Sequence, residues 1–398
     1  MRPPARILPL IVIAQFLCTS LWFSANAIAD DIIRFYSLGD GAFALITSSV
    51  QLGFIIGTLT FAIFSFADRY APSMVFFVSA IFGALANMGI LLPSNGLMSI
   101  LLYRFLVGFF LAGIYPIGMK IAADYYKGGL GKSLGFLLAA LVIGTASPHA
   151  LKAFPSFFSW SQILLMTSGL AFFGGLLMYL FVPSGPFCVR NVNFDYHLFL
   201  KVFEKSEFRS AANGYFGHMW ELYAFWAFVP LMIMEYNQIF LKAEINIYLF
   251  SFIIIASGSL SSILAGYLSV KYNSKSVATA FLGLSFIACL FSPLSFLIES
   301  EALFLFFLIF WGMVVIPDSP LFSSLVAQHS SAEAKGTALT IVNCIGFAIS
   351  ILSIQLISWL TEYVEFRLLL MLLALGPLWG LLALLKNKEK KSLEAVDQ

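Results

Sequence analysis

Residues 64–73 read FSFADRYAPS, and residues 266–275 read GYLSVKYNSK, 202 positions further along the chain. Each stretch is short and polar, and each follows an apolar run long enough to cross a membrane. Two further pairs recur at nearly the same offset, namely Ile114-Tyr115-Pro116 with Val315-Ile316-Pro317, and Lys132-Ser133 with Lys335-Gly336. Three correspondences at one spacing indicate an internal repeat, so we expect two related halves.

The composition places these halves in a membrane. Hydrophobic residues make up 60% of the chain and charged residues only 11%, whereas soluble domains carry about 25% charged residues. A bilayer can solvate so much apolar surface, and each crossing needs about 20 apolar residues. We therefore predict an all-α membrane protein whose twelve transmembrane helices, six in each half, use most of the 398 residues.

Charged residues and clusters of Pro and Gly separate the twelve apolar segments. The first six are expected near residues 7–29, 42–66, 74–92, 97–123, 132–152 and 160–182. The other six are expected near residues 209–234, 245–269, 276–298, 302–326, 336–360 and 367–385. The predicted organisation is an N-terminal six-helix half over residues 1–182, a cytoplasmic linker over 183–208, and a C-terminal half with a short basic tail over 209–398.

The distribution of basic residues predicts the orientation. With the N-terminus inside, sixteen of the 22 Lys and Arg residues fall on the cytoplasmic side and four on the outer side. This asymmetry is what the positive-inside rule requires, so both termini are expected in the cytoplasm of a bacterium, with the helices in its inner membrane. The four cysteines show no metal-binding spacing, and we expect neither a metal nor a cofactor.

The repeated loop resembles the hallmark loop of the major facilitator superfamily of secondary transporters, G-x-x-x-D-R/K-x-G-R/K-R/K. The first copy keeps Asp68 and Arg69 but has Phe64, Ala71, Pro72 and Ser73 at the other motif positions. The second copy keeps Gly266, Lys271 and Lys275 and has Val270 in place of the acid. The resemblance implies a fold of two six-helix halves, transport by alternating access, and a gating role for Asp68 and Arg69.

Two more motifs support the resemblance. Arg104, Gly108, Ala112 and Gly113 match the family's R-x-x-x-G pattern in the fourth span, and Gly135, Gly144 and Pro148 partly match its antiporter motif in the fifth. Three local stretches resemble a bacterial subgroup of the family for which we know no settled substrate, and they contain Trp22 and Asn26, Tyr115, and Trp220.

Polar residues within the spans are candidates for a substrate cavity, because they are costly in hydrocarbon unless they face water or a partner. The first span carries Gln15, Thr19, Trp22 and Asn26 at steps of four, three and four, which places all four on one helix face. Hydrogen bonding between helices is an equally good explanation of this stripe. Arg104 either faces the interior, where it would favour an anionic or zwitterionic solute, or reaches back to the interface. Tyr115 and Trp220 complete the set of cavity candidates.

Three residues in the second half are candidates for proton coupling. Glu221 and His218 lie three apart in the seventh span and therefore on one face, and a carboxyl buried there can carry a proton. A buried carboxyl hydrogen-bonded to a neighbour is the alternative. Asp318 lies between Pro317 and Pro320, which break the tenth span and free backbone carbonyls for an ion or substrate site. A kink whose acid pairs with a cytoplasmic base is the competing interpretation.

The predicted function is therefore secondary active transport of a small organic solute, coupled to protons, by a chain expected to be a monomer in the bilayer. No Walker-type nucleotide loop is present, and nothing points to nucleic acid. Proton-driven efflux of drugs or metabolites is the alternative within transport. A membrane receptor or enzyme is a weaker alternative, because the chain has no catalytic constellation and no sizeable soluble domain.

Overall fold

The computed structural model describes the chain except residues 1–3, 40, 127–129, 188–202, 332–333 and 397–398, and it describes no side chains at 130–132 and 387–396. The described residues are almost entirely helical and contain no strand, which confirms the predicted all-α class. The chain divides into two compact units. Unit 1 comprises residues 1–193 and 244–259, and unit 2 comprises residues 194–243 and 260–398. Most of the predicted linker, 188–202, lies outside the described residues.

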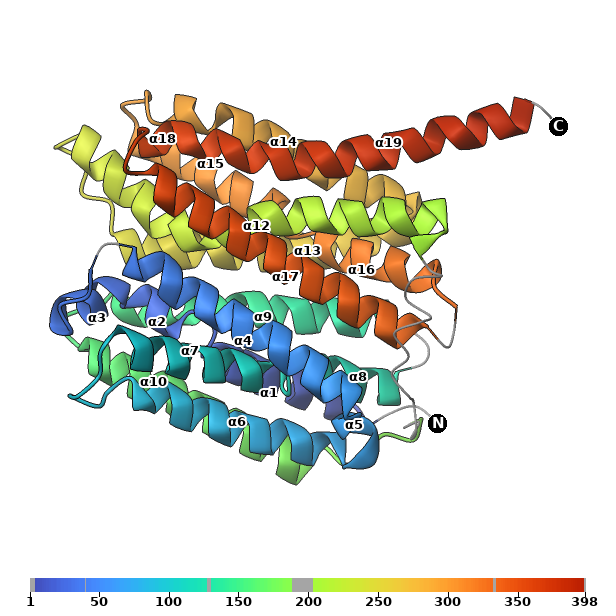
Figure 1. Ribbon diagram of the computed structural model, residues 1–398, viewed down its shortest axis with the longest axis horizontal. Helices are drawn as coiled ribbons and strands as arrows, with labels where there is room; N and C mark the ends of the chain where they lie inside the picture. Colours follow the sequence, from blue (N-terminus) through green and yellow to red (C-terminus); the bar gives the residue numbers. More distant parts are fainter. Residues whose placement is uncertain (1–3, 40, 127–129, 188–202, 332–333, 397–398) are drawn as a thin grey trace. The chain divides into compact units, whose positions relative to one another are not determined.

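In unit 1 the helices run side by side (Figure 1). In chain order they are α1 (Ile7–Thr19), α2 (Ser24–Ala27), α3 (Ala29–Phe35), α4 (Ala42–Ile63), α5 (Phe66–Arg69), α6 (Pro72–Gly89), α7 (Leu97–Leu111), α8 (Tyr115–Tyr125), α9 (Leu130–Lys152) and α10 (Trp160–Phe181). Sequence signals set several of these ends. Pro72 opens α6, and Ser159 caps α10 in a reciprocal capping box with Gln162.

Unit 2 consists of a second set of parallel and antiparallel helices. They are α12 (Ser206–Ile239), the later part of α13 (Ile247–Tyr272), α14 (Ser274–Ser295), α15 (Glu301–Val314), α16 (Asp318–Gln328), α17 (Lys335–Leu360), α18 (Phe366–Leu369), the 3₁₀ turn η1 (Leu370–Ala374) and α19 (Leu375–Val396). Asn273 separates α13 from α14 with a φ of 63°, and its side chain accepts a hydrogen bond from the Ser276 N–H.

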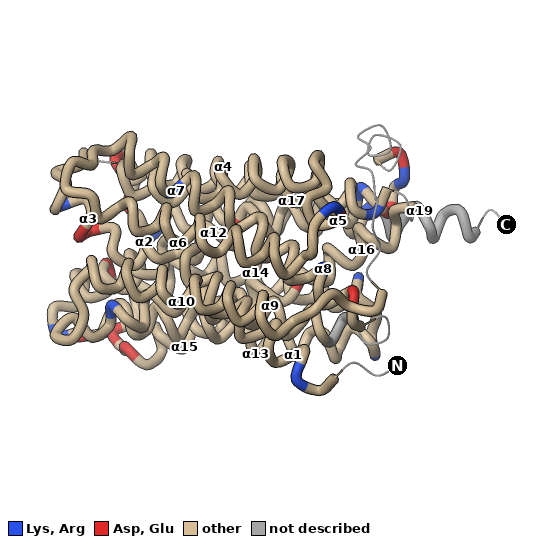
Figure 2. The backbone as a smooth tube through the Cα atoms, turned by 90° about the horizontal axis from the view of Figure 1, so that it is seen from below, with Lys and Arg blue, Asp and Glu red and all other residues tan. Residues whose placement is uncertain are grey.

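Ten helical segments of the described chain are long and apolar enough to cross a membrane. The remaining two predicted spans are the first, where α1 stops after 13 residues, and the seventh, where the 34-residue α12 contains polar residues such as His218 and Glu221. Charged residues gather towards the helix ends, as a bilayer requires (Figure 2).

Three predicted spans are interrupted, the tenth as its prolines predict and the first and fourth without having been predicted. The first span breaks between Thr19 and Ser24, so its polar stripe does not follow one straight helix. The fourth span breaks between Leu111 and Tyr115, and the tenth between Val314 and Asp318. In the last two cases a proline stands at the break, where it cannot donate the helical hydrogen bond. The matching breaks in the fourth and tenth spans agree with the internal repeat.

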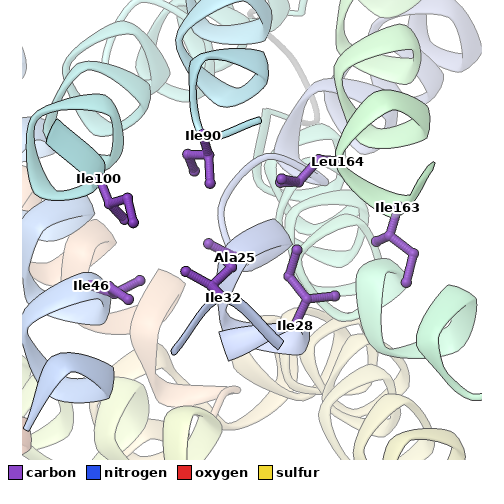
Figure 3. Close-up of a cluster of buried hydrophobic side chains, with 8 residues drawn as sticks. All are labelled: Ala25, Ile28, Ile32, Ile46, Ile90, Ile100, Ile163 and Leu164. Carbon is purple, nitrogen blue, oxygen red and sulfur yellow. The ribbon is translucent and has the colours of Figure 1, made fainter. Parts of the chain in front are cut away.

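An apolar cluster closes one end of unit 1 (Figure 3). Its eight buried side chains come from α2, α3, α4, α7, α10, the residue between α2 and α3, and the residue after α6: Ala25, Ile28, Ile32, Ile46, Ile90, Ile100, Ile163 and Leu164. Because the segment from α2 to α3 contributes three of them, Ala25, Ile28 and Ile32, the cluster holds the chain beyond the break in the first span. The break is therefore surrounded by packed structure on both sides.

Candidate functional site

The first helix of unit 2 carries two of the predicted coupling residues into the interior. His218 and Glu221 lie near the middle of α12, and each is 1% exposed. They are three residues apart and so share a face, but they reach different neighbours. Glu221 is directed to α14 and α15, whereas His218 is directed to α16.

Three neighbouring side chains hold the carboxyl group of Glu221. The indole N–H of Trp311 on α15 donates to its Oε1 at 2.6 Å, and the Ser285 hydroxyl on α14 donates to the same oxygen. The thiol of Cys289, one turn along α14, also hydrogen-bonds to this carboxyl group. Trp311 is itself fully buried and packs on Phe225, with ring centroids 4.6 Å apart.

Sequence reasoning missed all three partners. Ser285 and Cys289 lie four residues apart on an apolar helix, so their common face was a usable signal. Trp311 gave none, because a tryptophan in an apolar span is most simply explained as packing. Its indole nitrogen becomes informative only when a carboxylate is found beside it.

Asp318 meets His218 across the interior of unit 2. The Nδ1 of His218 lies 2.8 Å from the Oδ1 of Asp318, at ion-pair distance, and both side chains are 1% exposed. The contact lacks hydrogen-bond geometry, and the described residues provide no other hydrogen-bond partner for the polar atoms of either side chain. Asp318 occupies this place because the tenth span breaks immediately before it, at Pro317.

Trp220, the neighbour of Glu221 on α12, has different partners. Its indole N–H donates to the Leu372 carbonyl oxygen in η1 at 3.0 Å, and its side chain lies against Gly376 at the start of α19. Trp220 therefore contacts η1 and α19, whereas Glu221 bonds to side chains of α14 and α15.

In unit 1, Arg104 is fully buried, which contradicts the alternative of a side chain reaching back to the interface. Its guanidinium donates to the carbonyl oxygens of Leu21 and Trp22, at 3.2 and 2.5 Å, and to the Ser24 hydroxyl at 3.3 Å. These oxygens belong to the break in the first span. Arg104 thus supplies donors to carbonyls that have left the helical pattern.

A polar network continues from this break. Ser24 donates to Asn87 Oδ1 at 2.7 Å, and the Asn87 amide donates to Thr167, Ser168 and the Leu164 carbonyl oxygen. No carboxylate of the described chain pairs with Arg104. The positive charge of Arg104 is therefore stabilised by neutral oxygens, and both terminal nitrogens of its guanidinium group already donate hydrogen bonds.

The other cavity candidates of unit 1 lie on α1, α2 and α8. Gln15 is fully buried, and neither atom of its amide has a hydrogen-bond partner in the described part of the chain. Gly118 on α8 faces it so closely that a Cβ there would collide with its Oε1. Asn26 donates to Thr47 at 2.7 Å, Trp22 packs on Phe54 with centroids 4.9 Å apart, and Tyr115 opens α8.

The predicted gating residues Asp68 and Arg69 form the single turn α5. Asp68 Oδ1 accepts from the ammonium group of Lys120 on α8 at 2.8 Å. Among the described residues, no group of three or more His, Cys, Asp and Glu side chains could hold a metal ion.

A sequence model of the Major Facilitator Superfamily matches residues 11–354. The chain belongs to this superfamily. Members carry small-molecule solutes, and membership of the family supports a secondary transporter. A search of curated proteins found no significant match.

Solved structures of transporters share the fold. A bacterial homologue of the human lysosomal transporter Spinster superposes with a TM-score of 0.70 at 13% identity, over 96% of both chains. A variant of the nucleoside transporter NupG gives 0.71 at 14% identity, over 96% of this chain and 99% of that one. The human organic anion transporter MFSD10 gives 0.72 at 14% identity, over 96% and 100%. At such low identities the likeness concerns the fold alone.

Proposed function

We propose that the chain moves a small organic solute by alternating access and couples this movement to protons. The observation that supports the coupling is the buried group of Glu221, His218 and Asp318 in unit 2. Each side chain is 1% exposed, and no Lys or Arg of the described chain forms an ion pair with either acid. Ionisable groups are rare inside transmembrane helices and typically mark proton or ion pathways.

The hydrogen bonds of Arg104 bear on whether the solute is an anion. A free buried guanidinium would favour an anion, but this one donates to two backbone carbonyls and a hydroxyl. We therefore assign Arg104 to the break in the first span and leave Gln15, Trp22, Asn26 and Tyr115 as proposed contacts for a polar solute. Proton-driven efflux uses the same groups in the opposite direction.

The coupling can be tested in proteoliposomes. Counterflow is measured across amino acids, carboxylates, iron-chelating organic acids and drugs, with and without a pH gradient. We expect at least one solute to accumulate with the gradient, and the triple variant E221Q/H218N/D318N to retain counterflow but lose this accumulation. D124N, which changes a buried acid of unit 1, is the matched control.

Two outcomes would contradict the proposal. Accumulation that survives in the triple variant would remove the role of these residues in coupling. Failure of every solute to move under any gradient would contradict transport of the solute classes tested.

We also propose that both termini face the cytoplasm of a bacterial cell, from the distribution of Lys and Arg, and that the chain works as a monomer. A reporter that is active only in the cytoplasm, fused after Lys391, should be active. An inactive reporter, with an export-dependent reporter active at the same position, would reverse the orientation.

A further inference from the structure

Resting on the proposed proton coupling, we infer that the exchangeable proton resides on the pair His218 and Asp318, and that Glu221 is a fixed carboxylate. Glu221 would then act as a positioning residue, held in place by Trp311, Ser285 and Cys289. The sequence alone favours Glu221 as the proton carrier, so this inference changes the assignment of roles within the cluster.

The hydrogen bonds of Glu221 suit an ionised carboxylate. An indole N–H can donate but cannot accept, so the contact with Trp311 at 2.6 Å requires an acceptor on Glu221. The Ser285 hydroxyl and the Cys289 thiol also donate to this group. Hydrogen bonds to an ionised acceptor are shorter and stronger than those between neutral groups. A proton added to Glu221 would remove the negative charge that shortens and strengthens these hydrogen bonds.

His218 and Asp318 lack such support. Their four polar atoms make no hydrogen bond with the described chain, although Nδ1 and Oδ1 are only 2.8 Å apart. Burying an ionised group without a partner is costly, so the pair is stable when it shares a proton, either as an ion pair or as two neutral groups. Losing that proton leaves an unpaired carboxylate and therefore requires a change of surroundings, such as the entry of water.

The titratable neighbours of the pair are few. Glu221 lies one turn along α12 and interacts electrostatically with Asp318. The thiol of Cys289 on α14 hydrogen-bonds to Glu221. The ring centroid of Tyr215 lies 6.0 Å from that of His218. No Lys or Arg of the described chain forms an ion pair with Asp318. We assign Glu221 a fixed negative charge beside the pair, and this is its positioning role.

The two roles can be separated without knowing the solute. Infrared difference spectra of the purified full-length protein, recorded between acidic and alkaline pH, report which carboxyl and imidazole groups change protonation. We expect bands from Asp318 and His218 to titrate, to disappear in D318N and H218N, and to persist in E221Q at a shifted midpoint. Ring-labelled histidine identifies the imidazole bands, since the chain has four histidines.

W311F provides a second variant, which leaves the pair intact if D318N fails to fold. Loss of the indole donor should bring a Glu221 carboxyl band into the difference spectrum, whereas D124N should match the wild type. The inference is overturned if the titrating carboxyl band disappears in E221Q and persists in D318N, or if no band titrates in the wild type. If the expected bands titrate but transport ignores the pH gradient, the proposed coupling fails while the assignment of protonation stands.

Discussion

The first spans of the two units both carry buried polar groups, but these groups differ in charge and in their effect on the helix. In unit 1 the helix breaks between Thr19 and Ser24, and a cation, Arg104, donates to the freed carbonyls. In unit 2 α12 continues from Ser206 to Ile239, and its polar feature is an acid, Glu221. At the repeat offset of 202, Glu221 corresponds to Thr19, whose neutral hydroxyl donates to carbonyl oxygens, those of Gln15 and Phe16 on its own helix and that of Ala140 on α9.

The third span of each unit shows the same divergence. Asn87 on α6 and Cys289 on α14 are also 202 residues apart, and each contacts the first span of its own unit, Asn87 through Ser24 and Cys289 through Glu221. Asn87 belongs to a network of neutral groups that is well supplied with partners. Cys289 hydrogen-bonds to the carboxyl group of Glu221. Beside Glu221, the side chains of Asp318 and His218 have no hydrogen-bond partner in the described chain. We infer that unit 1 uses its buried polar groups to hold a bent backbone, whereas unit 2 uses them for protonation.

Close packing against the last helix is common to both units. Gly174 on α10 and Gly376 on α19 are 202 residues apart, and each lies against the backbone of the first helix. A Cβ on Gly376 would collide with the Gly217 carbonyl oxygen, and one on Gly174 would come within 2.9 Å of the Ala14 carbonyl oxygen. The repeat therefore preserves the packing of the backbone while the polar chemistry differs.

The largest effect on this comparison is expected from R104L. The substitution removes the donors to two buried carbonyls, and each unsatisfied group costs about 1–3 kcal/mol. We expect a marked fall in the melting temperature of the detergent-solubilised protein. R104K should fall between R104L and the wild type, because a single ammonium group cannot reproduce the fork of the guanidinium.

R34A serves as the control, because the Arg34 side chain is 76% exposed and makes only local contacts among the described residues, an i,i+3 pair with Asp31 and a hydrogen bond to the Asp30 carbonyl oxygen. Such surface pairs contribute about 0–1 kcal/mol. If R104L melts like R34A, Arg104 does not hold the break, and the contrast between the two units fails.

A smaller effect is expected from adding one methyl group at the shared contacts. G376A and G174A should each destabilise the fold by about 1–3 kcal/mol, because overpacking forces the neighbouring backbone apart. G376A should destabilise the fold more than G174A, since its Cβ would lie closer to a backbone oxygen and would also meet the Trp220 side chain. Thermal melts of the two variants measure both values.

G169A is the matched control within α10, because nothing lies within 4 Å of its added Cβ. Alanine in a helix interior is favoured over glycine by about 0.5–1 kcal/mol, so this variant should be neutral or slightly stabilised. Equal destabilisation by G169A and G174A would show that helix packing is not the cause.

Much of the fold follows from local sequence. Apolar runs of the length of a bilayer, separated by charges, determine the helices, and the repeat at 202 residues indicates the two halves. The prolines mark the breaks at Tyr115 and Asp318 because proline cannot complete the helical hydrogen bonds. The break in the first span contains no proline. The donors to its carbonyl oxygens come from Arg104, more than 80 residues away, so the local sequence does not predict this break.

The candidate site divides in the same way. The residue types alone identified Glu221, His218 and Asp318, because ionisable groups in apolar spans are few and costly. Their contacts depend on which helices pack together. Trp311 and Ser285 donate to Glu221, and His218 lies against Asp318. The sequence by itself determined a membrane protein, because composition reflects the solvent that surrounds each helix, and its internal repeat determined the two related halves. Only the tertiary structure decided which buried charge has partners, because hydrogen bonds between helices join residues that the sequence keeps far apart.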